Sequence, residues 1–381
     1  MLTRIPAEIF PPGEFIREEL EVRGWTQGDL AQIMDRPLRL INELVAGKKQ
    51  ITPETARGLS KAFGDGDPLY WMNLDAAYRL RQLEPDEDTA VDRRAKLYSL
   101  FPVREMMKRN WIEPSKNLDV IEHRVCRFFR IKNLDEKPMF ALAAKAAQYD
   151  ERTSLQWAWL FRANELAEGT HSSPYSERKL RDALVRLREF LVAQEEIRQV
   201  PTVLAEAGLR FVIVEFLPGA KIDGATFWLG NTPVIAMSLR FDRVNNFWFI
   251  LRHEIEHVLN GDGLVVDVEL TESLQRKEVV RPEETRANAA ASEFLVPKAE
   301  LDSFITRVRP LYSEQRILLF ARRIGVHPGI VVGQLQFRDE LPYTHFHKHL
   351  VKIREIVTQT AITDGWGTVP SIPGTERRYE R

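Results

Sequence analysis

The residues best suited to chemistry are His253, Glu254 and His257, which form a His-Glu-x-x-His pentad. Two imidazoles four positions apart on a helix lie about 40° apart around its axis and roughly 6 Å apart along it. They can bind one Zn²⁺ ion from the same face, and the intervening glutamate can reach a metal-bound water and accept its proton. The pattern predicts hydrolysis of a peptide bond. The alternative is a surface helix on which two histidines coincide by chance.

A catalytic zinc site also needs a third protein ligand and one open position. The helix expected over residues 283–295 is the natural place for this ligand. Its small residues Ala287, Ala290 and Ala291 would let it pack closely against the helix that carries the two histidines. The sequence therefore predicts two adjacent helices that build the site together.

The elements that must position these helices begin near residue 208, where the hydrophobic period changes. Stretches rich in β-branched and aromatic residues predict three strands, at 211–216, 225–229 and 233–239. A helix is expected from about residue 245 to the C-cap pair Asn260-Gly261. Strands followed directly by the metal-binding helix are typical of a zincin-like arrangement. If the strand at 225–229 is an edge strand, a substrate peptide can add to it as an extra strand.

Several short motifs follow one another in these elements: Lys221-Ile222-Asp223-Gly224-Ala225, Phe247-Trp248, His253-Glu254-x-x-His257, Glu284-x-x-Ala287-Asn288, Ala291 and Phe294-Leu295-Val296-Pro297. In this order they resemble the ImmA/IrrE-type metallopeptidases over roughly residues 200–340, and the first two fit the versions fused to a helix-turn-helix. The resemblance implies a zincin-like minidomain in which Glu284 is the acidic zinc ligand. From the residues alone, Glu284 is also an ordinary acid at a helix start, favoured by the macrodipole. One departure is Glu256, where the family usually has a small residue.

The chemistry assigns a role to each residue of this site. His253 and His257 would bind Zn²⁺ as neutral imidazoles, and Glu284 would add a carboxylate oxygen. Glu254 would receive a proton from the zinc-bound water, whose pKa falls to about 7, and would pass it to the leaving amine. Asn288, one turn beyond Glu284, would hydrogen-bond that carboxylate.

The first 82 residues predict a bundle of short helices. Gly24 ends the first helix, Thr26 caps the second with Asp29 reaching back, and Pro37 suits the start of the third. Two helices joined by a short turn and shielded by others predict a helix-turn-helix. This part contains, in order, Pro12-Gly13-Glu14, Trp25-Thr26-Gln27, Ile41-Asn42-Glu43-Leu44, Gly47-Lys48, Ile51-Thr52 and Trp71-Met72-Asn73-Leu74. With these residues it resembles the HigA-like addiction-module antidote regulators.

Within such a module, Arg36, Arg39 and Asn42 are the candidates for contacts to DNA bases, and Lys48 and Lys49 are placed for phosphates. Residues 1–82 are close to neutral in charge, which argues against strong DNA binding. A weak or purely protein-binding module is therefore the alternative.

Bulk properties narrow the class of protein. The chain has 381 residues, a formal net charge of −1 and a single cysteine, Cys126. One cysteine excludes a disulfide framework and a multi-cysteine zinc site, and the near-neutral charge excludes a global basic field. The N-terminus lacks the apolar stretch of a secretory signal, and no apolar run is long enough to span a bilayer. We expect a cytoplasmic protein with no membrane partner.

The expected fold is mainly α with a small α+β part. It comprises a five-helix-like helix-turn-helix domain at 1–82, a helical linker or dimerisation region at 83–200, and a zincin-like minidomain with a short antiparallel sheet at 201–345. A C-terminal extension follows at 346–381, with a disordered tail from about residue 364. Helices of the middle region are predicted at 94–108, 118–129, 141–149 and 178–194.

Two functions fit these observations. The first is a DNA-binding transcription regulator, or antitoxin-like protein, that carries a zinc-dependent endopeptidase; the resemblance implies a regulatory substrate such as a repressor or an antitoxin, cut under stress. The second is a non-enzymatic antidote-type repressor whose zincin domain is a sensor or partner-binding module. The expected partners are operator DNA through residues 1–82, a cognate toxin, and a second copy of the chain, since half-site reading by such modules uses a dimer. The presence of Glu254 favours the enzyme.

Overall fold

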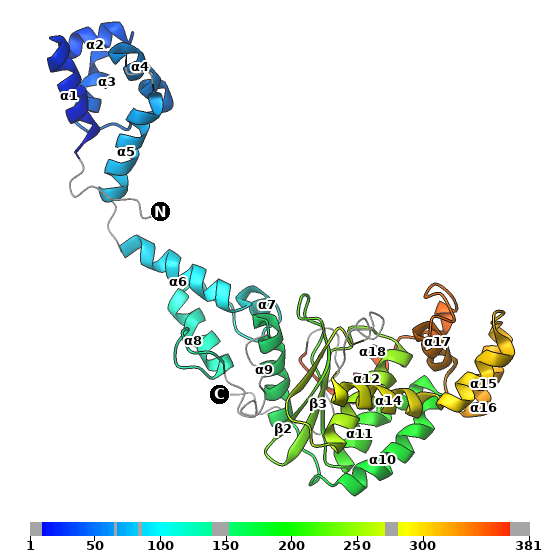
Figure 1. Cartoon of the computed structure of the whole chain (residues 1–381). Helices are drawn as coiled ribbons and strands as arrows, with labels where there is room; N and C mark the ends of the chain where they lie inside the picture. Colours follow the sequence, from blue (N-terminus) through cyan, green and yellow to red (C-terminus); the bar gives the residue numbers. More distant parts are fainter. Residues whose placement is uncertain (1–9, 65–66, 83–85, 139–151, 271–280, 366–381) are drawn as a thin grey trace. The chain divides into compact units, whose positions relative to one another are not determined.

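The computed structural model describes residues 10–64, 67–82, 86–138, 152–270 and 281–365. The chain divides into two compact units, within residues 1–95 and 96–381 (Figure 1). The helix predicted at 141–149 lies outside the described residues, and so does almost all of the tail expected to be disordered from about residue 364.

The first unit is a bundle of helices. Its elements are α1 (Pro12–Arg23), α2 (Gln27–Ile33), α3 (Leu38–Val45), α4 (Pro53–Phe63) and α5 (Pro68–Gln82). Helix α6 (Asp86–Leu100) contains the boundary between the units.

Local sequence explains where these helices begin and end. Gly24 ends α1 in the left-handed conformation, with φ of 66°. Thr26 and Asp29 form the predicted capping box: Thr26 Oγ1 accepts from Asp29 N at 3.2 Å, and Thr26 N donates to Asp29 Oδ2 at 2.7 Å. Gly13 lets α1 approach α3 closely, because a Cβ at this position would clash with the backbone of Val45. The buried side chains of the bundle, among them Ile16, Leu30, Ile41, Leu59 and Trp71, form one core.

The second unit contains a five-stranded sheet with helices around it. Its helices are α7 (Val103–Lys108), α8 (Leu118–Phe129), α9 (Ser154–Glu168), α10 (Glu177–Glu189), α11 (Val200–Glu206), α12 (Val244–Leu259), α14 (Pro282–Leu295), α15 (Lys298–Val308), α16 (Glu314–Ile324), α17 (Pro328–Phe337) and α18 (Arg354–Val357), with 3₁₀ turns η3 (Phe190–Val192), η4 (Gln194–Gln199) and η5 (His347–His349). Its strands are β1 (Arg210–Ile213), β2 (Ile222–Leu229), β3 (Thr232–Met237), β4 (Val265–Val268) and β5 (Ile362–Thr363).

The strand order of the sheet is β4-β2-β3-β1-β5. The three strands predicted from the sequence correspond to β1, β2 and β3, and β2 pairs with β3 in antiparallel register across Gly230-Asn231. Strand β4 is also antiparallel to β2, so β4, β2 and β3 form the expected short antiparallel sheet. Strands β1 and β5 add to it in parallel pairings, which makes the whole sheet mixed.

Both faces of this sheet are buried beneath helices. Successive side chains of a strand point to opposite faces, so each strand contributes to two cores. Phe211 and Ile213 of β1 join one core with α12 and its neighbours, whereas Val212 joins a second core with α8 and α9. Figure 1 shows α9 and α12 on opposite sides of the strands. Each large apolar side chain buried in these cores contributes roughly 1.5–3 kcal/mol.

Two helices of the middle region, α8 and α9, belong to this second core, whereas α10 packs in the core around α12. Helices α8 and α9 supply Val125, Phe129, Trp159 and Phe161 to the core beneath the sheet. Helix α8 matches the prediction at 118–129, whereas α9 was not predicted. The domain boundaries expected at residues 82, 200 and 345 stay predictions.

The fold class is confirmed: the described chain is mainly helical and carries one small sheet. None of the helices in the described ranges combines the length and the hydrophobicity that crossing a bilayer requires.

Candidate metal centre

Helices α12 and α14 lie side by side and build the candidate site. The predicted apolar anchors of α12 are all buried, and they fix this helix on the sheet: Phe247, Trp248, Ile250, Leu251 and Ile255. On α14, Ala287 and Ala291 are fully buried, which permits the close approach expected from their size. Because both helices are held by apolar packing, the polar side chains between them have fixed positions.

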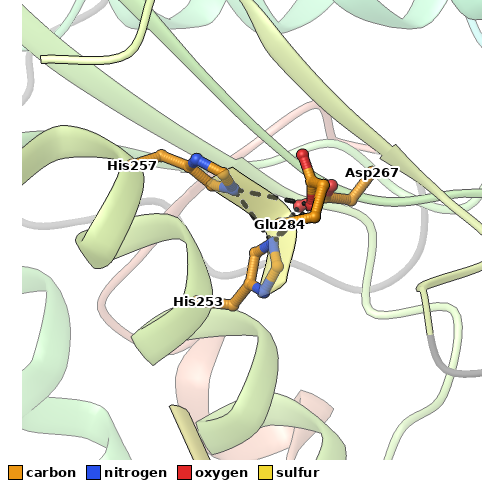
Figure 2. A group of neighbouring side chains, drawn as sticks. All are labelled: His253, His257, Asp267 and Glu284. Atoms are coloured by element: carbon orange, nitrogen blue, oxygen red, sulfur yellow. Dashed lines mark hydrogen bonds and ion pairs between the residues drawn. The ribbon is translucent and has the colours of Figure 1, made fainter. Parts of the chain in front are cut away.

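Four side chains converge between these helices and β4. His253, His257, Asp267 and Glu284 each offer one ligand atom, and these four atoms all lie within 4.8 Å of one another. Figure 2 shows the two histidines projecting from successive turns of α12 toward the two carboxylates. The Nε2 atoms of the histidines are 3.0 Å apart. The His253 Nε2 atom lies 3.1 Å from Asp267 Oδ2 and 3.3 Å from Glu284 Oε2, which is 3.8 Å from His257 Nε2.

The donor set and its spacing fit a divalent metal such as Zn²⁺. Tetrahedral ligands at zinc–nitrogen and zinc–oxygen bond lengths lie about 3.3 Å apart, and the measured distances of 3.0 to 3.8 Å bracket this value. Asp267 Oδ2 is buried, and it faces His253 Nε2 at 3.1 Å. A buried carboxylate is costly unless a cation neutralises it, and here that cation is either a protonated His253 or a bound metal. The structure thus brings together the three ligands predicted from the sequence.

Asp267 was not predicted, because β4 was not. It is the third residue of β4, and its Cα pairs with that of Gly224 in β2. The stretch Val265-Val266-Asp267-Val268 does carry a signal, since one acid within a run of valines indicates a buried polar position in a strand. Its contact with the histidines depends on the strand register, which the sequence does not specify.

Charges within the cluster shift its titration. Burial alone would lower the pKa of His253, but the negative charge of Asp267 raises this pKa well above its ordinary value. Burial likewise would raise the pKa of Asp267, but the facing His253 lowers it to about 2. Asp267 is therefore ionised at neutral pH, and binding of a metal at His253 must displace a proton.

Glu254 lies beside the cluster and is fully buried. Thr226 Oγ1 of β2 donates a hydrogen bond to its Oε2 at 2.6 Å. Its Oε1 faces the backbone of Gly224, where any Cβ would clash with it. Burial and the negative charge of Asp267 raise the pKa of Glu254 well above its ordinary value. A carboxylate so placed has a high proton affinity, as a general base requires.

Glu256, the departure from the family pattern, points away from the cluster. Its Oε2 accepts from Arg252 Nη2 at 2.8 Å and its Oε1 from Asn260 Nδ2 at 3.1 Å. Burial would raise the pKa of Glu256, but these two hydrogen bonds hold it below its ordinary value. Arg252 and Asn260 thus bind the Glu256 carboxylate on another face of α12.

Asn288 is placed differently from the prediction. Among the described residues, no hydrogen bond joins it to Glu284, and its Oδ1 is buried without a partner. Instead, the carboxylate that supports a ligand is Asp262, which accepts from His257 Nδ1 at 2.8 Å. The turn at Gly261, with φ of 65°, returns the chain so that Asp262 reaches the histidine.

This Asp262 contact should control metal affinity. A carboxylate on Nδ1 fixes the tautomer of His257 with the Nε2 lone pair toward the cluster, and the loss of such a partner typically costs 10–100-fold. We expect Asp262→Asn to weaken Zn²⁺ binding by about 10–100-fold, measured by competition with a chromophoric chelator. The matched control is Arg286→Gln, because the exposed Arg286 contacts the same carboxylate at 3.2 Å. Equal affinities of Asp262→Asn and the control would show that Asp262 has no such role.

The candidate DNA contacts lie on the first unit. Arg36, Arg39 and Asn42 are exposed on and before α3, and Lys48 and Lys49 are exposed after it. Arg39 is 89% exposed and pairs with Glu43, one turn along the helix, at 2.8 Å. All five side chains are accessible to a partner, while Ile41 and Leu44 on the opposite face of α3 are buried.

Comparisons with known proteins concern this first unit. No protein-family model matches the chain. Virulence-associated protein I of Dichelobacter nodosus is 38% identical over 79 residues, which are 20% of this chain and 72% of that protein. An uncharacterized HTH-type transcriptional regulator of Haemophilus influenzae is 38% identical over 85 residues, 22% of this chain and 76% of that protein. The uncharacterized HTH-type transcriptional regulator YddM of Escherichia coli is 32% identical over 83 residues, which are 22% of this chain and 87% of that protein.

These matches fall on the N-terminal helices and leave α12 and α14 outside. The unit that they cover has the helix-turn-helix arrangement α2–turn–α3, with its exposed polar face on α3. Through about its first 80 residues, the chain belongs to the family of helix-turn-helix transcriptional regulators.

Proposed function

We propose that the chain is a DNA-binding transcriptional regulator that also carries a zinc-dependent endopeptidase. The observation that supports the second activity most strongly is the convergence of His253, His257 and Glu284 beside the buried Glu254. A surface helix with coincidental histidines would not bury three such groups against a carboxylate from a second helix. Asp267 completes the buried donor set.

Each residue of the site has its own role in the proposed hydrolysis. When bound, Zn²⁺ acts as a Lewis acid that polarises a peptide carbonyl and acidifies a water molecule. His253, His257 and Glu284 would hold the ion, and Asp262 fixes the orientation of His257. Glu254 takes the proton from the attacking water and delivers it to the leaving amine. Thr226 holds the Glu254 carboxylate in place through its hydroxyl.

The substrate class follows from the resemblance to ImmA/IrrE-type metallopeptidases: a regulatory protein such as a repressor or an antitoxin. A direct test is incubation of the zinc-loaded chain with a proteome-derived peptide library, followed by mass spectrometry of new N-termini. Cleavage at a consistent sequence, absent after chelation and restored by Zn²⁺, is the expected result. No new termini at any zinc loading would contradict the peptidase.

A non-enzymatic regulator is the second candidate. The observation in its favour is the number of protein ligands, because structural zinc sites have four and catalytic sites keep one position open. With Asp267, the cluster offers four. In this case the second unit would be a sensor or partner-binding module, and a cognate toxin would be its partner. The chain would bind zinc, and the peptide library would stay uncut.

The regulator function predicts DNA binding through residues 1–82, by a homodimer that reads two half-sites. Arg39 is the strongest candidate for a base contact, because it is highly exposed on α3 and, among the described residues, its competing partner is Glu43 in a surface ion pair. We expect Arg39→Ala to weaken binding to an operator selected from random DNA by about 1–3 kcal/mol, measured by fluorescence anisotropy. Lys61→Ala, exposed in the last turn of α4, is the control and should retain near-normal affinity. Equal effects of both variants would place base recognition elsewhere.

A further inference from the structure

Strand β4 occupies the side of β2 that faces the catalytic carboxylate. It pairs antiparallel with residues 222–226 of β2, and Asp267 lies opposite Gly224. Gly224 is the residue whose backbone contacts Glu254. The prediction that a substrate peptide joins β2 as an edge strand therefore does not hold for this stretch, because β2 lies between β3 and β4. The place of an added peptide strand is taken by the chain itself.

Asp267 of the same strand occupies the metal cluster. Its Oδ2 lies 3.1 Å from His253 Nε2 and within 4.8 Å of the ligand atoms of His257 and Glu284. Hydrolytic zinc sites have three protein ligands and an open position, whereas a fourth protein ligand closes the coordination sphere. In the structure, four protein side chains thus converge where a hydrolytic site would have three.

Strand β4 itself is short and weakly packed, although buried leucines flank it. The strand has four residues, its pairing with β2 is irregular between Ile222 and Gly224, and among its own side chains only Asp267 is buried. Val268 is 39% exposed, whereas Val266 packs partly against the core and Leu264 and Leu270 on either side are buried. Short strands with few buried apolar side chains are drawn from the part of a structure that opens at low free energy. Displacement of β4 therefore means separation of these four residues from β2 between the two anchored leucines.

We propose that β4 is a self-inhibitory strand: Asp267 is a displaceable fourth ligand, and an extended substrate peptide replaces β4 along residues 222–226 of β2. The occupant is an extended peptide, because removal of β4 exposes a row of backbone N–H and C=O groups that another strand satisfies. The inference rests on the proposed function, since it requires a metal at the cluster. It assigns a resting, closed state to the peptidase.

The test measures access to the metal independently of catalysis. Wild type, Asp267→Ala and Asp267→Asn are loaded with Co²⁺, and acetohydroxamate is titrated in while the visible absorption is followed. Asp302→Ala is the matched control, because Asp302 lies on α15 and bonds to Lys298. If one molecule in ten or fewer is open in wild type, removal of Asp267 tightens the apparent Kd for acetohydroxamate by about tenfold or more.

Each outcome is decisive. About one Co²⁺ per chain in all proteins, with at least tenfold tighter acetohydroxamate binding in both Asp267 variants only, supports the proposal. Equal binding in wild type and variants, with the metal retained, overturns it and leaves the peptidase intact. Loss of the metal in the Asp267 variants also overturns it, because Asp267 would then be a permanent ligand. Absence of metal from wild type contradicts the proposed function itself.

Discussion

Glu254→Gln is expected to retain its zinc and to lose proteolysis. The side chain keeps its size, and its amide oxygen can still accept the hydrogen bond of Thr226, so the packing around β2 is preserved. The amide cannot accept a proton at neutral pH, and loss of a general base typically costs 10²–10⁴-fold. We therefore expect the cleavage rate of a peptide identified from the library to fall by about 10²–10⁴-fold, with zinc content unchanged by elemental mass spectrometry.

Glu256→Gln is the control for this experiment. The two glutamates are two residues apart on α12, yet Glu256 binds Arg252 and Asn260 and not the cluster. This variant should cleave at nearly the wild-type rate. Proteolysis that persists in Glu254→Gln would remove Glu254 as the base. Equal loss in both variants would indicate general damage to α12.

The second large effect is the loss of metal from His253→Ala. Its Nε2 atom lies within 3.3 Å of a ligand atom of each of the other three residues, so its removal takes away the ligand that contacts all of the others. We expect about one zinc per chain in wild type and almost none in the variant, measured by elemental mass spectrometry. Zinc should also stabilise wild type by about 2.7 kcal/mol at a concentration of 100 times its Kd, with no such shift in the variant.

His345→Ala is the matched histidine control, because His345 is exposed and lies in a different part of the second unit. It should bind zinc as wild type does. No zinc in wild type, even after reconstitution, would contradict the peptidase and leave the helix-turn-helix regulator. Zinc retained in His253→Ala would place the ion elsewhere in the chain.

Much of the fold could be predicted from local patterns. The capping box at Thr26 and Asp29, the strands β1 to β3 and the helix α12 all follow from residues that are adjacent in the sequence. Hydrophobic periodicity and caps act over one or two turns, so a single sequence contains their signal. Helix α9 escaped prediction although it opens with a capping box at Thr153 and Gln156. It is apolar around much of its circumference, and a buried helix of this kind has no amphipathic period.

The candidate site could be predicted only in part, for a physical reason. His253 and His257 are linked by helix geometry alone, which the spacing encodes. Asp267 reaches them only through the register of β4 on β2, and Asp262 only through the turn at Gly261. These contacts depend on tertiary structure, and a one-residue shift in register would turn Asp267 to the other face of the sheet.

The contact between Gly224 and Glu254 has a consequence for the comparison of distant sequences. A His-Glu-x-x-His pentad specifies the glutamate but not the space that its carboxylate occupies, and here that space exists because position 224 has no side chain. A chain that keeps the pentad but carries any larger residue opposite it must move either the strand or the carboxylate. Glycine thirty residues before the glutamate is therefore a second feature, readable without a structure, that leaves room for the carboxylate of the pentad.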